Sequence, residues 1–204
     1  MAGKAVVFDF GKVISFPPED SVMEELAAIA GLEVNTMDGL VWKYRGEYDR
    51  GTVSAQEYYR TMLGSVGIFP DDAALERMIR IDLQSWTRIN PETVALMEKV
   101  KRSGYILGIL SNMPHDFLAL ARSSFPVFSL PQVSVFSCET GSIKPEKAIY
   151  RTLLDRVSCK AEEVVFFDDI QINIDAAKEA GIRAFLWKDP KTAWNVLQQA
   201  GIPL

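Results

Sequence analysis

The stretch AVVFDFGKVI, residues 5–14, decides the fold prediction. An apolar and largely β-branched run ends on Asp9, and Phe10 and Gly11 follow at once. A run of this kind, without alternating polar residues, is typical of a strand that is buried on both faces of a parallel sheet. Open α/β sheets bind their ligands at the edge where such strands end. Asp9 is therefore the first candidate for an active-site residue.

Further runs of the same character follow along the chain, and segments with helical spacing separate them. Asn90 and Pro91 give an N-cap and a first-turn proline to one such helix, and Gly104 closes it just before a strand. This alternation predicts an α/β fold with a Rossmann-like, doubly wound parallel sheet. The first strand is expected at residues 5–10 and the further strands at 105–111, 164–168 and 183–187, with a weaker candidate at 133–136.

Residues 16–88 interrupt this alternation because they contain helix signals and no convincing strand. We expect Ser21 to cap one helix, Ser54 and Glu57 to form a capping box ahead of another, and Asp71 or Asp72 to open a third. An insertion directly after the first strand lies over the ligand-binding edge of the sheet.

We therefore predict an α/β core domain of residues 1–15 and 89–204 with an inserted α-helical cap domain of residues 16–88. The cap is expected to act as a lid that excludes water from the site, and a dimer interface is the alternative.

Composition excludes several classes of protein. The 204 residues are 48% hydrophobic and 24% charged, which is typical of a soluble domain with a sizeable core. The net charge is −5 and no run of Lys or Arg is present, so we expect no nucleic-acid partner. The apolar stretch after Lys4 is too short for a signal peptide or a membrane span, and Cys138 and Cys159 lack metal-site spacing. We expect a cytoplasmic monomer or homodimer that does not bind membranes.

Polar residues follow several of the predicted strands at the point where each strand ends. Asp9, Ser111-Asn112 and Asp168-Asp169 hold such positions, and Lys144 precedes a helix in the turn GSIKP. Parallel strand ends converge on one crevice, where three carboxylates would repel one another unless a cation offset them. Oxygen donors of this kind suit Mg²⁺, and the lysine and hydroxyl add donors for a phosphate group. The combination indicates phosphoryl transfer to an aspartate nucleophile.

Each of these residues also has a purely structural interpretation. A single Asp at a strand end often caps a turn, and Asp168-Asp169 could cap the helix that follows. Lys144 could be a surface lysine, and Ser111-Asn112 could serve only to form a turn. Their joint occurrence at the correct strand ends favours a functional site.

Four motifs together resemble the haloacid dehalogenase-like hydrolase superfamily over nearly the whole chain. The fourth motif is the most specific, because its paired acids, Asn173 and Gly181 all fall in place. The resemblance is greatest to the branch of sugar-phosphate phosphatases and the phosphatase domain of soluble epoxide hydrolase. The motifs are FDFGKVI, LSN, SIKP with the following Tyr150, and VVFFDDIQINIDAAKEAGI.

The resemblance implies a Mg²⁺-dependent phosphatase of small phosphorylated metabolites. Asp9 would be the nucleophile and would share Mg²⁺ with the main-chain carbonyl of Gly11 and with Asp169. Asp168 would act behind the metal or through water, and Asn173 would order that loop. The residues expected to hold the phosphate oxygens are Ser111, the Asn112 amide and Lys144.

Gly11 departs from the family pattern, which has an Asp acting as general acid–base at this position. Loss of such a group typically costs about 10²–10⁴ in rate. A dehalogenase, which uses no metal, also lacks this Asp, but the pair Asp168-Asp169 beside the nucleophile would repel its carboxylate substrate and favours the phosphatase. A pseudoenzyme or interaction protein is the other alternative.

A phosphatase with Gly11 is expected to prefer a good leaving group, such as an anomeric sugar oxygen, or to take its acid from elsewhere. His115, the single histidine of the chain, could approach the crevice, although a surface position at a helix start is the favoured interpretation. Arg45, Tyr48 and Arg50 form a polar cluster near a turn that we expect at glycines 46 and 51. These three side chains are candidate substrate-binding residues, and a solvated helix face explains them equally well.

Overall fold

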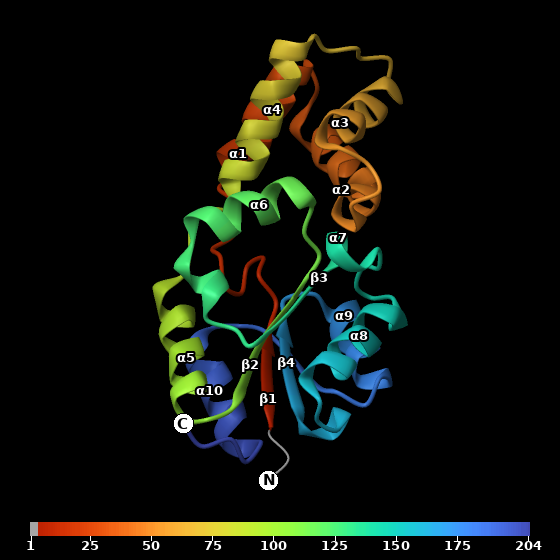
Figure 1. The fold of residues 1–204 in the computed structure, drawn as a ribbon. Coiled ribbons are helices and arrows are strands. Elements are labelled where there is room, and N and C mark those ends of the chain that lie inside the picture. Colours follow the sequence, from red (N-terminus) through yellow and green to blue (C-terminus); the bar gives the residue numbers. More distant parts are fainter. Residues whose placement is uncertain (1–3) are drawn as a thin grey trace.

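The structure is a computed structural model that describes residues 4–204, and its centre is a five-stranded parallel sheet (Figure 1). The strand order is β3-β2-β1-β4-β5, which is the doubly wound arrangement that the sequence predicts. The predicted strand at residues 5–10 ends earlier, so Asp9 lies directly beyond it. The strands are β1 (Ala5–Phe8), β2 (Ile106–Ser111), β3 (Val133–Phe136), β4 (Val164–Asp168) and β5 (Arg183–Leu186).

Helices cover both faces of this sheet (Figure 1). Helices α5 and α10 lie on one face, and α8 and α9 lie on the other. Asn90 accepts hydrogen bonds from the first turn of α5, as the sequence predicts. The helices of the core are α5 (Pro91–Arg102), α6 (His115–Ser124), α7 (Ser137–Thr140), α8 (Lys147–Val157), α9 (Gln171–Glu179) and α10 (Pro190–Gln199), with 3₁₀ turns at Pro126–Ser129 and Ala161–Glu163.

The register of β1 aligns the strand ends that carry the predicted site. Phe8 lies opposite Ile109 of β2 and Phe167 of β4. The Asp9 N–H then donates to the Phe167 carbonyl over 2.9 Å, so Asp9 and Asp168 leave neighbouring strands at the same level. Strand pairing therefore brings together two carboxylates that are distant in the sequence.

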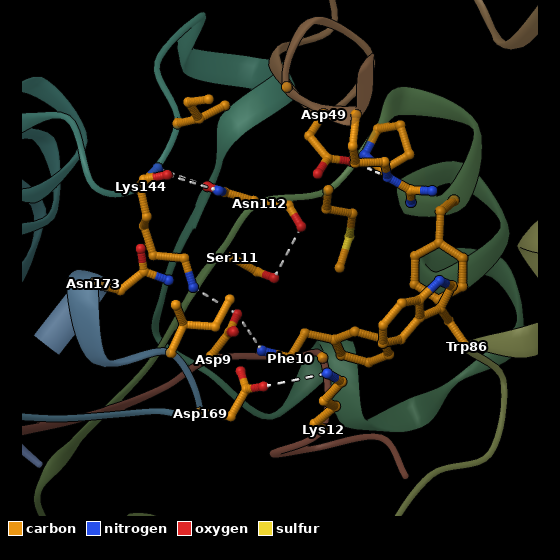
Figure 2. A pocket seen from close by; sticks show the side chains of 18 of the residues that line it. Asp9, Phe10, Lys12, Asp49, Trp86, Ser111, Asn112, Lys144, Asp169 and Asn173 are labelled. Atoms are coloured by element: carbon orange, nitrogen blue, oxygen red, sulfur yellow. Dashed lines mark hydrogen bonds and ion pairs between the residues drawn. The ribbon is translucent and has the colours of Figure 1, made fainter. Parts of the chain in front are cut away.

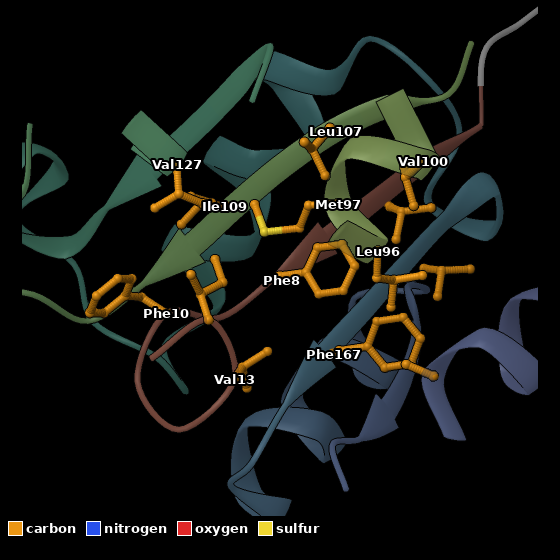
Figure 3. Close-up of a cluster of buried hydrophobic side chains, with 14 of the residues drawn as sticks. Phe8, Phe10, Val13, Leu96, Met97, Val100, Leu107, Ile109, Val127 and Phe167 are labelled. Atoms are coloured by element: carbon orange, nitrogen blue, oxygen red, sulfur yellow. The ribbon is translucent and has the colours of Figure 1, made fainter. Parts of the chain in front are cut away.

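Side chains of β1 alternate between two apolar cores. Val6 and Phe8 point into the cluster beneath α5 and α10, and Val7 points into the cluster beneath α8 and α9. Phe8 is fully buried and stacks on Phe167 with ring centroids 5.6 Å apart (Figure 3). Burial on both faces explains why the strand contains no polar residue before Asp9.

Four helices form the insertion between β1 and α5 and enclose an apolar cluster of their own. The chain leaves and re-enters the core beside an antiparallel bridge between Ser15 and Ile89. We call residues 16–88 the helical insertion. Its helices are α1 (Asp20–Ala30), α2 (Val34–Arg50), α3 (Ala55–Gly64) and α4 (Asp72–Ser85).

The helix caps in the insertion agree only in part with the sequence. The capping box of Ser54 and Glu57 is confirmed, and Asp71 accepts from the first turn of α4. The prediction that Ser21 caps α1 is wrong. The helix begins at Asp20, and Glu19 takes the N-cap position without a side-chain hydrogen bond. Gly46 lies inside α2 rather than in a turn, since one glycine costs a helix only about 1 kcal/mol.

Polar contacts attach the end of α2 to the core. Arg50 donates to both carboxylate oxygens of Glu146, at 3.0 and 2.7 Å, and to the Gly141 carbonyl. The Ser137 hydroxyl donates to the Asp49 carbonyl, and the Tyr48 hydroxyl donates to Asp116. The last turn of α2 is therefore held against the loop that carries Lys144.

Among the described helices, none is both long and apolar enough to cross a membrane.

Substitution Phe8→Ala tests the packing of the sheet. Removing a fully buried ring should lower the free energy of unfolding by about 3–5 kcal/mol, measured by urea denaturation. The control is Phe69→Ala, because Phe69 is 84% exposed and its loss should cost less than about 0.5 kcal/mol. Equal effects of the two substitutions would contradict the described core.

The contact between Arg50 and Glu146 should make stability depend on pH. Hydrogen bonds from Arg50, Ser142 and the Ile143 N–H lower the pKa of Glu146 from 4.5 to about 2. A carboxyl whose pKa is depressed by folding stabilises the fold above its unfolded pKa and loses this effect as pH falls toward the folded value.

Wild type should therefore be more stable than Glu146→Gln at pH 7, and the difference in urea midpoint should shrink as pH falls from 4.5 toward 2. Glu179→Gln, at an exposed carboxylate 3.8 Å from Lys147, serves as the control without such a trend. A difference that is constant with pH would show that the ion pair does not stabilise the fold.

Candidate active site

One pocket collects nearly all of the residues that the sequence singles out as a site. It lies beyond the carboxyl ends of β1, β2 and β4 and is closed on one side by the helical insertion (Figures 1 and 2). Water-sized molecules can occupy about 260 Å³ of it, which leaves room for a phosphate group and a small organic group. The predicted residues that line it are Asp9, Gly11, Arg45, Ser111, Asn112, Lys144, Asp169 and Asn173.

Lys144 links the two carboxylates that leave β1 and β4. Its ammonium lies 2.8 Å from Asp9 Oδ1 and 2.6 Å from Asp168 Oδ2, and the lysine side chain is 2% exposed. Burial opposes the charge on Lys144, but Asp168 and Asp9 outweigh it and raise the pKa of the lysine. Lys144 therefore stays a cation inside the protein.

Asp168 is fully buried behind the pocket wall, and protein donors occupy both of its carboxylate oxygens. Oδ1 accepts from the Ile170 N–H at 2.8 Å and from the Asn173 amide at 3.0 Å, while Oδ2 accepts from Lys144. The Tyr150 hydroxyl donates in turn to the Asn173 carbonyl. Asp168 is thus suited to hold Lys144 and the loop after β4 rather than to bind a ligand directly.

Asp9 and Asp169 keep carboxylate oxygens that face the pocket. Asp9 Oδ1 lies 2.8 Å from the Lys144 ammonium and accepts a hydrogen bond from the Phe10 N–H. Asp9 Oδ2 has no hydrogen-bond partner among the described residues. Asp169 Oδ2 lies 3.8 Å from the ammonium of Lys12, which is its salt-bridge partner among the described residues (Figure 2). Oxygens of Asp9, Asp168 and Asp169 lie within 4.8 Å of one another. The pocket-facing oxygens of Asp9 and Asp169, with Asp168 behind them, are a donor set that fits Mg²⁺.

The electrostatics of the site also favour a cation. Burial, together with the nearby charges of Asp168 and Asp169, raises the pKa of Asp9 to about 7 although Lys144 opposes the shift. Burial and Asp168 likewise raise the pKa of Asp169. A divalent cation between the two carboxylates would relieve this repulsion and favour their ionised forms.

Ser111 and Asn112 follow β2 and form the wall next to Lys144. The Asn112 side chain accepts from the Lys144 N–H at 2.7 Å and donates to the Lys144 carbonyl at 3.0 Å. These two bonds fix the main chain of the lysine and occupy the side-chain amide of Asn112. Ser111 lines the pocket, and within residues 4–204 its hydroxyl makes a single long contact, 3.4 Å, with the Asn112 carbonyl.

Gly11 packs against an aromatic ring from the insertion. A Cβ atom at this position would lie 3.2 Å from Cζ3 of Trp86, which is closer than usual van der Waals contact. Trp86 therefore occupies part of the space into which a side chain at position 11 would extend.

Arg45 lines the pocket, but two carboxylates already bind its guanidinium. Its Nε donates to Asp49 at 2.8 Å, and its Nη1 donates to both oxygens of Asp82 at 3.1 and 2.8 Å. Tyr48 and Arg50 do not line the pocket, since Tyr48 contacts Asp116 and Arg50 contacts Glu146.

His115 begins α6 and is exposed, as the favoured interpretation of the sequence held, and it is not part of the pocket wall. Sequence reasoning missed Trp42, Asp49 and Trp86, which line the pocket from the insertion. Trp42 and Asp49 share one face of α2 with Arg45, which the sequence singles out, and with Gly46. Their spacing of i, i+3, i+4 and i+7 is that of one helix face, so recognition of α2 would have revealed them.

Comparison with known proteins shows which family the chain resembles. A family model described as haloacid dehalogenase-like hydrolase matches residues 4–181. Phosphatase MT3486 of Mycobacterium tuberculosis (strain CDC 1551 / Oshkosh) is 25% identical, over 91% of this chain and 88% of that protein. Bifunctional epoxide hydrolase 2 of Sus scrofa is 33% identical over 98% of this chain, which corresponds to only 39% of the relative.

Solved structures share the fold. A HAD family enzyme from Bacteroides thetaiotaomicron, in complex with magnesium and inorganic phosphate, matches with a TM-score of 0.72 and 20% identity and covers 91% of this chain and 94% of its own. Dehalogenases are also among the structures with this fold. Since the family model spans most of the chain, the protein belongs to the haloacid dehalogenase-like hydrolases.

Proposed function

We propose that the protein is a Mg²⁺-dependent phosphatase that hydrolyses small phosphorylated metabolites through an aspartyl-phosphate on Asp9. The observation that carries this proposal is the arrangement of Asp9 and Asp169 at the pocket with the buried Lys144 ammonium beside Asp9. A phosphoryl group needs a carboxylate nucleophile and positive charge on the same side, and this site offers both.

The core residues have separate roles in this reaction. An oxygen of Asp9 attacks phosphorus, and the ammonium of Lys144 and the hydroxyl of Ser111 hold the phosphate oxygens as charge develops. Asp168 keeps Lys144 in position because it binds the ammonium at 2.6 Å. Mg²⁺ would be held by Asp9, Asp169 and the Gly11 carbonyl, with Asp168 and Asn173 behind them, and would neutralise phosphate charge.

We propose that the helical insertion, residues 16–88, acts as a cap over the core of residues 1–15 and 89–204. Trp42, Asp49 and Trp86 line the pocket from this insertion. Aromatic rings on this side exclude water from the reacting groups. They also suit a substrate with an apolar face, and a sugar phosphate meets this requirement through its C–H groups.

A dehalogenase is the alternative enzyme because Gly11 removes the usual acid–base and solved dehalogenases share the fold. The site itself supports the phosphatase more strongly. Asp169 lies at the pocket beside Asp9, and its negative charge would repel the carboxylate of a haloacid. A pseudoenzyme is less consistent with a lysine buried against the nucleophile at 2.8 Å.

Phosphate release from a panel of sugar, nucleotide and polyol phosphates tests the proposal. We expect hydrolysis of at least one member with Mg²⁺ and none after chelation. Asp9→Asn should lower kcat by more than about 10³-fold because the nucleophile is lost. The matched control is Asp175→Asn, the same change at an exposed residue of α9, which should retain activity.

Two results would overturn this function. One is the absence of any phosphate release that depends on Asp9. The other is metal-independent halide release from 2-haloacids that Asp9→Asn abolishes, which would establish the dehalogenase instead.

A further inference from the structure

We propose that Asp49, from helix α2 of the insertion, is the general acid–base of this enzyme. This inference rests on the phosphatase function proposed above. It assigns to the insertion the role that family members give to an Asp at the position of Gly11.

Asp49 faces the reacting groups from across the pocket. Its carboxylate lines the same cavity as Asp9, Ser111 and Lys144. In Figure 2 it lies on the side away from Asp9, with Ser111 and Asn112 between them. The Asp49 side chain is 14% exposed, so it is largely withdrawn from bulk water but still open to the cavity.

The geometry of phosphoryl transfer requires an acid on that side. The attacking and leaving oxygens lie roughly in line on opposite sides of phosphorus. With Asp9 attacking and Lys144 and Ser111 holding the phosphate oxygens, the leaving oxygen points toward the insertion. Among the described lining residues from the insertion, Asp49 is the carboxylate that can meet it.

The charges around Asp49 allow it to carry a proton. Arg45 lies between two carboxylates and donates once to Asp49 but twice to Asp82. One guanidinium neutralises only one of the two acids, so the cluster can take up one proton and become neutral. Asp49 Oδ1 accepts from Arg45, and no described residue is recorded as a partner of Oδ2.

Burial raises the pKa of Asp49, and the neighbouring Asp82 adds to this effect, while Arg45 and Lys144 oppose it. A raised pKa favours the protonated form of the carboxyl, which is the form that a general acid needs.

Other candidates for this role are less well placed. Gly11 has no side chain that could act as an acid. Trp86 occupies the space beside it, 3.2 Å from where a Cβ of residue 11 would lie. His115 is exposed and outside the pocket wall. Lys12 is 46% exposed and its ammonium faces Asp169 on the side of the nucleophile.

The proton passes through Asp49 in two steps. As the Asp9 oxygen bonds to phosphorus, the bond from phosphorus to the leaving oxygen breaks, and that oxygen keeps the electron pair and takes the proton of Asp49. Water then bonds to phosphorus and gives a proton to the Asp49 carboxylate, while the bond between phosphorus and Asp9 breaks. The net reaction is hydrolysis to alcohol and phosphate, and both aspartates return to their starting states.

The test compares leaving groups that need a proton with one that does not. In Asp49→Asn, kcat/KM for the best alkyl phosphate substrate should fall by about 10²-fold or more, because its alkoxide must be protonated. For 4-nitrophenyl phosphate the loss should be less than about tenfold, because nitrophenolate leaves without a proton. The Asp49 carbonyl that binds Ser137 is unchanged by this substitution.

The matched control is Asp82→Asn, which disturbs the same arginine but does not line the pocket. Asp82→Asn should lower kcat/KM for both substrates by the same factor. Equal losses on both substrates in Asp49→Asn would overturn the role of Asp49 while leaving the phosphatase function intact. Wild type that hydrolyses only the nitrophenyl ester would overturn it too, and absence of hydrolysis dependent on Asp9 would overturn both proposals.

Discussion

The buried ammonium of Lys144 is the contact on which the rest of the site depends. It lies between Asp9 and Asp168, which leave neighbouring parallel strands. Removing one partner from a buried ion pair costs about 3–5 kcal/mol, because a charge is left without compensation. The lysine comes from a loop, and its main chain is fixed by one hydrogen bond that it donates to the Asn112 side chain and one that it accepts from it. The core can therefore hold two adjacent carboxylates because a third segment supplies the cation.

This compensation is incomplete, and the incompleteness favours the proposed chemistry. Lys144 offsets one charge among three carboxylates, and Lys12 reaches Asp169 only at 3.8 Å. The raised pKa values of Asp9 and Asp169 reflect the remaining negative charge as well as burial. A phosphate dianion cannot enter such a site favourably unless another cation accompanies it. The proposed Mg²⁺ would supply this cation between Asp9 and Asp169, whose oxygens lie close together.

Much of the core site could be predicted from the sequence because parallel pairing determines it. Once the apolar runs are recognised as strands, Asp9, Ser111 and Asp168 must meet at one edge of the sheet. The side of the pocket formed by the insertion could not be predicted in this way. Helix α2 contains two glycines and a largely polar surface, so its apolar pattern is weak. The contact of Arg45 with Asp82 depends on how α2 packs against α4, because the two residues are 37 positions apart in the sequence.

The core and the helical insertion thus contribute different kinds of side chain to the pocket. Groups that attract an anion belong to the core, since Arg45, the arginine with which the insertion lines the pocket, is already neutralised by Asp49 and Asp82. The insertion cannot then add much to phosphate binding, and its aromatic and acidic side chains face the organic part of a substrate instead. In the proposed phosphatase, capture of phosphate and departure of the alcohol are therefore assigned to different elements. We expect changes along α2 to alter which alcohol leaves without disturbing the ion pairs that hold Asp9.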